Sequence, residues 1–169
     1  VPLATYEAPL WPSTSRGARV SRETKGIRAV IVDDRMTRSI VLEAPDVEEA
    51  LRIANTLQND REQMAVIVEQ GSRFAKLVDI HFQIVGKLLY VRFELTTGDA
   101  AGHNMVTKAA DQLISWLLER YSQLKYISIS GNFCVDKKVS AVNGILGRGK
   151  YVIAEIVISR DICRRVLRT

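Results

Sequence analysis

Two strand-like runs joined by a Gly-Lys pair limit most strongly what this chain can fold into. In Lys76–Val85 polar and apolar residues alternate, and the apolar run Leu88–Leu95 follows after Gly86-Lys87. This pattern predicts an antiparallel hairpin in a sheet with one buried and one wet face. We expect His81 to be an outward strand residue rather than a ligand. The two alternating sets are Leu77, Asp79, His81 and Gln83, and Val78, Ile80, Phe82 and Ile84.

Helical patterns surround this hairpin. A long helix is predicted from about Gly102 to Tyr121, because its apolar residues recur with the helical period. Asp46, with Glu49 three residues later, predicts a capping box at the start of another helix. Gln63–Glu69 fits either a helix or a strand. Further strands are expected at Ile27–Val32, Thr37–Leu42, Lys125–Ser130 and Tyr151–Ile158, and a closing helix at Asp161–Leu167.

These elements mix without strict alternation of strand and helix, which favours an α+β fold over a doubly wound sheet. Residues 1–20 contain Pro2, Pro9 and Pro12 and are interpreted as a loop with short extended pieces. Asp33-Asp34 is interpreted as a turn between the first two strands. Because the first residue is Val1 rather than Met, we expect a processed or excised segment.

Composition narrows the classes of partner. The chain has 169 residues, with 24 Lys and Arg against 19 Asp and Glu, which gives a net charge of +5. Without an RNA-binding or zinc-finger motif, this charge favours a small phosphorylated ligand and no nucleic acid. Two cysteines and two histidines are too few for a disulfide scaffold or a structural zinc site, so no metal is expected. No apolar run approaches the roughly 18 residues of a membrane span.

Three segments contain residues that suggest a ligand-binding or catalytic role. Thr97–Asn104 follows a strand and opens a helix, and its small residues would let a ligand approach the backbone. Ser130–Lys138 is the densest polar cluster, and it is either an exposed charged loop or a site for an anionic substrate. Its Cys134 is interpreted as a small buried residue. Gly144–Tyr151 nearly matches a phosphate-binding loop, but Tyr151 stands where a magnesium-binding hydroxyl is needed, so a nucleotide triphosphatase is rejected. Its glycines and cations could still line an anion site.

Together these segments resemble the 3-hydroxy-3-methylglutaryl-CoA reductase family, of the kind with Asp-Lys-Lys in its catalytic loop. The resemblance runs through essentially the whole chain. Its strongest pieces, in the family's order and spacing, are Ser13–Arg19, Met36–Arg38, Ser72–Phe74, Gly98–Asn104, Ser130–Lys138 and Gly147–Lys150.

The resemblance implies a domain organisation. Residues 39–129 would form a small NAD(P)-binding domain with a ferredoxin-like antiparallel sheet and helices. Residues 1–38 and 130–169 would be fragments of a larger α+β substrate domain, the second of them containing the catalytic loop.

The resemblance also implies roles for individual residues. Lys137 would stabilise the oxyanion that develops as hydride arrives, and Glu7 would donate a proton or act in a charge relay. Arg38, Ser130, Asp136 and Lys138 would surround the substrate. Coenzyme A would contact Ser13, Thr14, Ser15, Arg16, Gly17, Ala18 and Arg19. The dinucleotide would contact Ser72, Arg73, Phe74, Asp99, Ala100, Ala101, Gly102, His103 and Asn104.

The implied activity is reduction of 3-hydroxy-3-methylglutaryl-CoA to mevalonate and coenzyme A with two NADPH, NADH being possible. The family also uses an aspartate and a histidine that would lie beyond Thr169, so we expect this chain alone to be inactive. The parent would be a cytoplasmic homo-oligomer with its active site at the subunit interface. The alternative is a non-catalytic dinucleotide-binding or regulatory module derived from the reductase.

Overall fold

In the computed structural model, which describes residues 3, 5–135 and 138–169, the chain divides into two units. One unit is Asp33–Tyr151, and the other consists of residues 1–32 and 152–169. The boundaries implied by the resemblance, after residues 38 and 129, stay a prediction.

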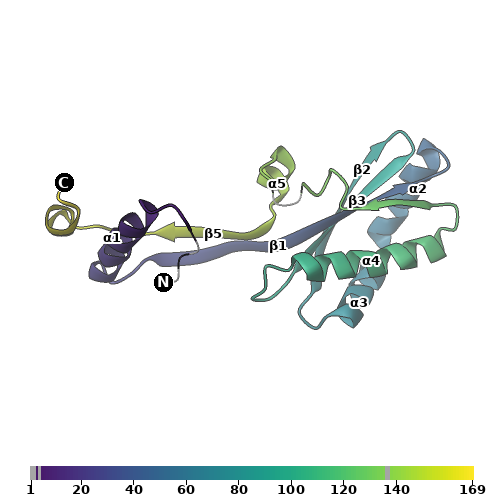
Figure 1. The fold of residues 1–169 in the computed structure, drawn as a ribbon. Helices are drawn as coiled ribbons and strands as arrows, with labels where there is room; N and C mark the ends of the chain where they lie inside the picture. Colours follow the sequence, from purple (N-terminus) through teal and green to yellow (C-terminus); the bar gives the residue numbers. More distant parts are fainter. Residues whose placement is uncertain (1–2, 4, 136–137) are drawn as a thin grey trace. The chain divides into compact units, whose positions relative to one another are not determined.

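The larger unit is built around an antiparallel sheet with the strand order β2-β3-β1-β4, and a further strand, β5, pairs with β1. Two helices separate β1 from β2, and another separates β3 from β4, which is the ferredoxin-like connection (Figure 1). This confirms the predicted α+β class and ferredoxin-like sheet. The elements are β1 (Arg28–Glu43), α2 (Val47–Asn59), α3 (Arg61–Gly71), β2 (Lys76–Val85), β3 (Leu88–Thr96), α4 (His103–Arg120), β4 (Lys125–Ile129), α5 (Ala141–Leu146) and β5 (Gly149–Glu155).

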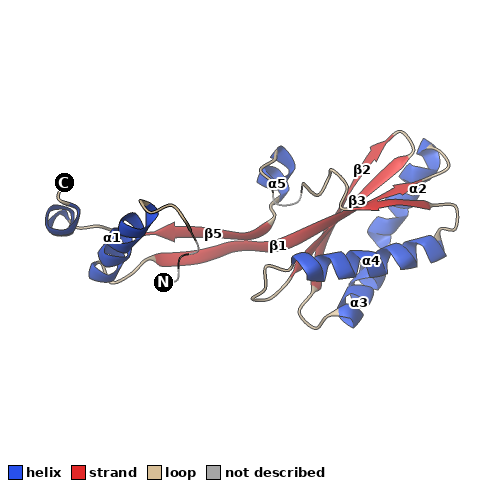
Figure 2. Cartoon of the chain, viewed as in Figure 1, coloured by secondary structure: helices blue, strands red, loops and turns tan. Residues whose placement is uncertain are grey.

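One face of the sheet forms the core with α2, α3 and α4 (Figure 2). Phe93 at the centre of β3 and Leu113 on α4 are fully buried in it. The predicted capping residue of α2 is confirmed, since the Asp46 side chain accepts from Glu49 N at 2.8 Å. The Glu49 carboxylate binds Arg52 and Gln123, and these hydrogen bonds lower its pKa to about 2.

A bulge in β2 shifts its alternation by one residue. The register with β3 is interrupted between Leu77 and Asp79. Leu77 therefore packs against the core, on the same side as Ile80. The prediction that Leu77 and Asp79 share a face of the sheet was wrong. The extra residue at the bulge reverses the face to which the side chains on one side of it point.

The second face of the sheet is also covered in the larger unit. A Cβ atom on Gly131 would lie 2.3 Å from the Val41 side chain, and Arg92 donates to the carbonyl of Gly147 at 2.7 Å. Residues between β4 and β5 therefore lie against this face. Arg92 and Glu94 are fully buried as a result, although the sequence predicted a wet face here.

Strand β1 is longer than predicted, because it continues through Asp33 and Asp34 where a turn was expected. The Asp33 carboxylate accepts from Arg35, and Asp34 accepts from Lys150 at 2.8 Å. Pairing with these cations lets the two acids stay in an extended strand. Gln63–Glu69, which fitted either a helix or a strand, lies in α3.

The smaller unit begins with helix α1 (Leu10–Glu23), where a loop was predicted. Pro9 caps this helix and Pro12 lies in its first turn, where a backbone N–H has no partner within the helix. The prolines therefore do not break it. The expected closing helix is present as α6 (Arg160–Ile162), which continues as a π-helix, η1 (Cys163–Leu167). Arg165 binds Glu23 of α1 at 2.6 Å.

None of the helices in the part of the chain that the structure describes combines the length and the apolar character needed to cross a membrane.

Candidate functional site

The two segments predicted to contact a dinucleotide lie side by side in the larger unit. One follows α3, where the Ser72 hydroxyl accepts from Phe74 N and Ala75 N at 3.2 and 3.3 Å. The Arg73 guanidinium stacks 4.7 Å from the centre of the Phe74 ring. The other follows β3, and a Cβ atom on Gly98 would lie 3.5 Å from Phe74. The structure therefore brings Ser72–Phe74 against the loop that leads into α4.

That loop depends on glycine at its end. Gly102 has a φ of +84° and caps α4, and a Cβ atom there would lie 2.3 Å from the Thr97 side chain. Thr97 is buried and donates to the carbonyl of Ala100 at 2.7 Å. Asp99, Ala100 and Ala101 are exposed, and so is Asn104 in the first turn of α4. The loop thus presents its backbone, and the free N–H groups of an 18-residue helix, to a ligand.

Lys150 holds this loop in place. Its ammonium group donates to the Gly98 carbonyl at 2.7 Å and to Asp34 at 2.8 Å, so it links the β3–α4 loop to strand β1. The sequence did not indicate a contact between Lys150 and Gly98, because the glycines and cations of Gly144–Tyr151 were considered only as the lining of an anion site. The presence of Lys150 in the Gly147–Lys150 piece of the resemblance was the available signal.

We expect Lys150→Met to open the loop without unfolding the sheet. Losing a hydrogen bond to a charged, partly exposed group costs about 1 kcal/mol, so amide exchange at Gly98–Gly102 should accelerate about fivefold. Hydrogen exchange followed by mass spectrometry measures this. Lys87→Met is the matched control, because Lys87 pairs with Glu43 at 2.8 Å. Equal exchange in Lys150→Met and wild type would contradict the role of Lys150.

The Ser130–Lys138 segment adjoins strand β1. Ser130 has a φ of +70°, and its N–H donates to the Ser39 carbonyl at 2.6 Å. The buried Cys134 contacts Thr37, which confirms the prediction for this cysteine. Arg38, between the two contacted β1 residues, is itself 8% exposed. Asp136 and Lys137 lie outside the described residues. A hollow at this segment is lined by Ser130, Gly131, Asn132, Val135 and Lys138.

The remaining predicted residues belong to the smaller unit. Glu7 is exposed, its N–H donates to Thr5 Oγ1 at 3.1 Å, and its carbonyl accepts from Leu10 N. Ser13–Arg19 lies within α1 and is exposed throughout. The roles of Glu7 and Lys137 stay predictions, and Lys137 lies outside the described residues. A second hollow is lined by Pro12, Ser15, Arg16, Arg19, Val166, Leu167 and Arg168.

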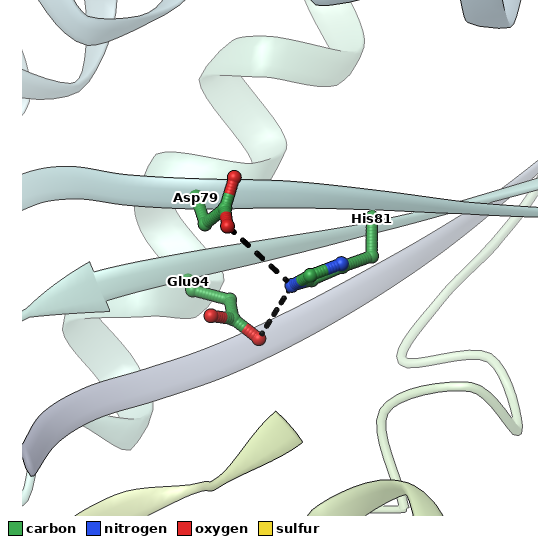
Figure 3. Close-up of side chains that lie close together, drawn as sticks. All are labelled: Asp79, His81 and Glu94. Carbon is green, nitrogen blue, oxygen red and sulfur yellow. Dashed lines mark ion pairs between the residues drawn. The ribbon is translucent and has the colours of Figure 1, made fainter. Parts of the chain in front are cut away.

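An ionic cluster of Asp79, His81 and Glu94 lies on the second face of the sheet, where Glu94 is fully buried and the other two are partly exposed (Figure 3). His81 Nε2 lies 3.2 Å from Glu94 Oε1 and 3.8 Å from Asp79 Oδ2. His81 therefore points away from the helix-packed core, as predicted, and its side chain is 27% exposed. The ligand atoms of these three residues lie within 4.8 Å of one another. Arg35 and Arg92, however, both bind the Glu94 carboxylate. Two guanidinium groups on one carboxylate disfavour a metal ion there.

Glu94 balances the charge of this cluster. Burial lowers the pKa of the Arg92 guanidinium, and the Glu94 carboxylate opposes this shift. Hydrogen bonds that Arg35 donates to the Asp33 and Glu94 carboxylates raise the pKa of Arg35. The cluster also reaches the segment before β5, since Arg92 donates to the Gly147 carbonyl. It therefore links strands β2, β3 and β1 to the segment that precedes β5.

A family model and curated relatives match this chain to the same family. The family model described as hydroxymethylglutaryl-coenzyme A reductase matches residues 1–169. The 3-hydroxy-3-methylglutaryl-coenzyme A reductase of Pyrococcus abyssi is 41% identical over 170 residues, which is 100% of this chain and 42% of that protein. The Zea mays enzyme is 40% identical over 171 residues, 30% of its length. The chain thus spans less than half the length of these curated relatives.

A solved structure of a class II 3-hydroxy-3-methylglutaryl-CoA reductase from Streptococcus pneumoniae, bound to NADPH in open conformations, shares the fold. It matches with a TM-score of 0.67 at 20% identity, covering 94% of this chain and 41% of that one.

Proposed function

Because the chain belongs to the hydroxymethylglutaryl-coenzyme A reductase family, we propose that the protein it forms part of reduces 3-hydroxy-3-methylglutaryl-CoA to mevalonate and coenzyme A with two NADPH. This chain contributes the dinucleotide site and part of the substrate site. The observation that carries the proposal is the contact of Phe74 with Gly98, which joins the two segments expected to bind the dinucleotide.

The residues at this contact suit a dinucleotide. Arg73 supplies a cation beside a phosphate, and the Phe74 ring offers a flat apolar surface. The exposed backbone of Asp99–Ala101 and the start of α4 suit an electron-rich group. NADPH supplies the hydride when bound, and the residues of this chain hold and orient it.

The substrate side is proposed from the family's residues. Lys137 holds a fixed positive charge where the oxyanion develops, and Glu7 donates a proton. Arg38, Ser130, Asp136 and Lys138 bind the substrate's carboxylate and hydroxyl groups. The hollow that includes Ser130 and Lys138 supports this grouping.

Coenzyme A is proposed to contact Ser13–Arg19. On α1, Arg16 and Arg19 lie three residues apart and line the same hollow, so both can meet phosphates. We also propose that the parent is a cytoplasmic homo-oligomer whose active site forms between subunits.

The test is a titration of the chain with NADPH and NADH, followed by the fluorescence of Trp116 and Trp11 and by calorimetry. We expect saturable binding that weakens about tenfold, or about 1.4 kcal/mol, in Arg73→Ala and Asn104→Ala, because each removes a direct contact. Arg28→Ala is the charge-matched control, since Arg28 pairs with Glu155 in the smaller unit.

Two outcomes of this titration would contradict the proposed dinucleotide site. Binding that Arg73→Ala and Asn104→Ala leave unchanged would place the dinucleotide elsewhere. An absence of binding to both dinucleotides would overturn the dinucleotide site. Adding 3-hydroxy-3-methylglutaryl-CoA to the bound chain should leave NADPH unoxidised, because the family's further aspartate and histidine are not among these residues.

A further inference from the structure

The side chain of Asn143 on helix α5 joins the two ends of the proposed catalytic loop. Its Nδ2 group donates to the Val135 carbonyl and to the Lys138 carbonyl, each at 3.0 Å. Between these two residues in the sequence are Asp136 and Lys137, which lie outside the described residues. One amide therefore holds the backbone on both sides of two residues to which the proposed function gives a role at the substrate.

The orientation of this amide follows from its surroundings. If Nδ2 and Oδ1 exchanged places, Oδ1 would face two carbonyl oxygens and could donate to neither. In the orientation present, Oδ1 is buried and has no hydrogen-bond partner among the residues that the structure describes. A buried acceptor without a donor is unfavourable, so the amide of Asn143 is poorly explained by stability alone. What it provides, and an apolar side chain would not, is its pair of donated hydrogen bonds.

Val135 depends on outside contacts to keep its backbone conformation. Its φ is +42°, which a β-branched residue adopts only at a cost. Residues in such conformations persist where the surrounding structure holds them. The Val135 carbonyl accepts from the Asn143 amide at 3.0 Å and from Lys138 N at 3.4 Å. Because the second contact is long, the Asn143 amide supplies the stronger of these two restraints.

Asn143 is itself held in place on α5. The Ser140 hydroxyl caps this helix and accepts from Asn143 N at 3.1 Å. The Asn143 carbonyl accepts from Gly147 N at 3.0 Å. The Gly147 carbonyl in turn accepts from the buried Arg92 guanidinium on β3 at 2.7 Å. Through these bonds, the amide ties the loop to the sheet.

The residues before Val135 have anchors of their own. Ser130 N donates to the Ser39 carbonyl at 2.6 Å, and the buried Cys134 contacts Thr37 on β1. These contacts do not involve α5. Loss of the Asn143 amide should therefore release the later part of the segment, from Val135 to Lys138, and leave the earlier part attached.

We infer that Asn143 is a positioning residue for the reaction, because its amide holds the flanks of Asp136 and Lys137 in the arrangement that catalysis requires. The inference rests on the proposed function, in which Lys137 places a positive charge where the oxyanion develops. Such stabilisation depends on preorganisation, and a displacement of about 1 Å can lower a rate about a hundredfold. The proposed dinucleotide segments meet at Phe74 and Gly98 instead, so cofactor binding should not depend on Asn143.

The experiment measures the oxidation of NADPH by 3-hydroxy-3-methylglutaryl-CoA in the full-length protein that contains this chain, for wild type and Asn143→Ala. We expect kcat to fall about 10- to 100-fold, or about 1.4–2.7 kcal/mol, and KM for NADPH to change less than about twofold. Asn55→Ala is the matched control, because Asn55 is an exposed amide on α2 and should alter neither constant.

Thermal unfolding of each variant verifies the fold. Asn143→Ser replaces Asn143→Ala if the latter does not fold. Its hydroxyl donates one hydrogen bond at most and cannot bridge both carbonyls, so kcat should fall by a smaller factor. The midpoint of unfolding should stay close to that of wild type, because the Lys138 carbonyl can bind water and the Val135 carbonyl keeps its bond from Lys138 N.

The outcomes separate this inference from the proposed function. A fall in kcat matched by an equal rise in KM for NADPH, or by an equal loss of folded protein, would make Asn143 a structural residue only and overturn the inference. A kcat within twofold of wild type would also overturn it, while the proposed function would stand. Wild-type protein that binds NADPH but does not oxidise it with this substrate would remove both proposals and leave the dinucleotide site.

Discussion

Replacing Glu94 with alanine should lower the free energy of unfolding by about 3–5 kcal/mol, the cost of breaking a buried ion pair from one side. Glu94 and Arg92 are both fully buried on the covered face of the sheet. Arg35 binds the same carboxylate at 2.7 Å, and His81 lies 3.2 Å from it. Without Glu94, the Arg92 charge remains in the interior, where the Gly147 carbonyl still accepts from it.

Urea unfolding followed by circular dichroism measures the effect. Glu43→Ala is the matched control, because Glu43 pairs with a lysine on the surface and such pairs contribute less than about 1 kcal/mol. Glu94→Gln should fall between the two, since its amide still accepts from Arg92. A loss for Glu94→Ala no larger than that for Glu43→Ala would show that the cluster does not stabilise the sheet.

The parts of the fold with a clear period were predictable from the sequence. The hairpin of β2 and β3 and the helix α4 were predicted because strand and helix place apolar residues at different spacings. Leu113 and Leu117 of α4 are buried as that spacing requires. The Gly86-Lys87 turn and the Asp46 cap could also be predicted, because each depends on residues only a few positions away in the sequence.

The covered second face could not be predicted in the same way. Polar residues such as His81 and Glu94 in a strand are typical of a solvent-exposed face. Here Glu94 is fully buried and His81 is partly buried, and residues after β4 lie against this face, as the contact of Gly131 with Val41 shows. The alternation in β2 gave a wrong face for Leu77 for a related reason, because the bulge between Leu77 and Asp79 depends on pairing with β3.

The candidate site also has parts that could be predicted from contiguous residues and parts that could not. Ser72–Phe74 and Asp99–Asn104 were found through the family resemblance, which lies in contiguous residues. The contact of Lys150 with the Gly98 carbonyl was not predicted, because it joins parts of the chain that are 52 residues apart. The roles of Asp136 and Lys137 rest on the resemblance alone, since both lie outside the described residues.

Gly102→Ala should be the other strongly destabilising change, by about 2–5 kcal/mol. An alanine in the left-handed region costs about 1–2 kcal/mol, and forcing a methyl group into a packed site costs about 1–3 kcal/mol. The new Cβ atom would lie 2.3–2.7 Å from three atoms of the Thr97 side chain. Thr97 is 2% exposed and bonded to Ala100, so it cannot turn away without losing that hydrogen bond. NADPH binding should fall as well, because the same loop presents Asp99–Asn104.

Thermal and urea unfolding of Gly102→Ala, with NADPH titration on the folded fraction, test this expectation. Gly144→Ala is the control, because nothing lies within 4 Å of a Cβ atom there and its loss should stay below about 1 kcal/mol. The double variant Thr97→Ala with Gly102→Ala should recover the steric part of the loss but not the backbone part. If the double variant were less stable than Gly102→Ala, the contact with Thr97 would not be the cause. In that case the requirement for glycine would come from the left-handed backbone at the start of α4 alone.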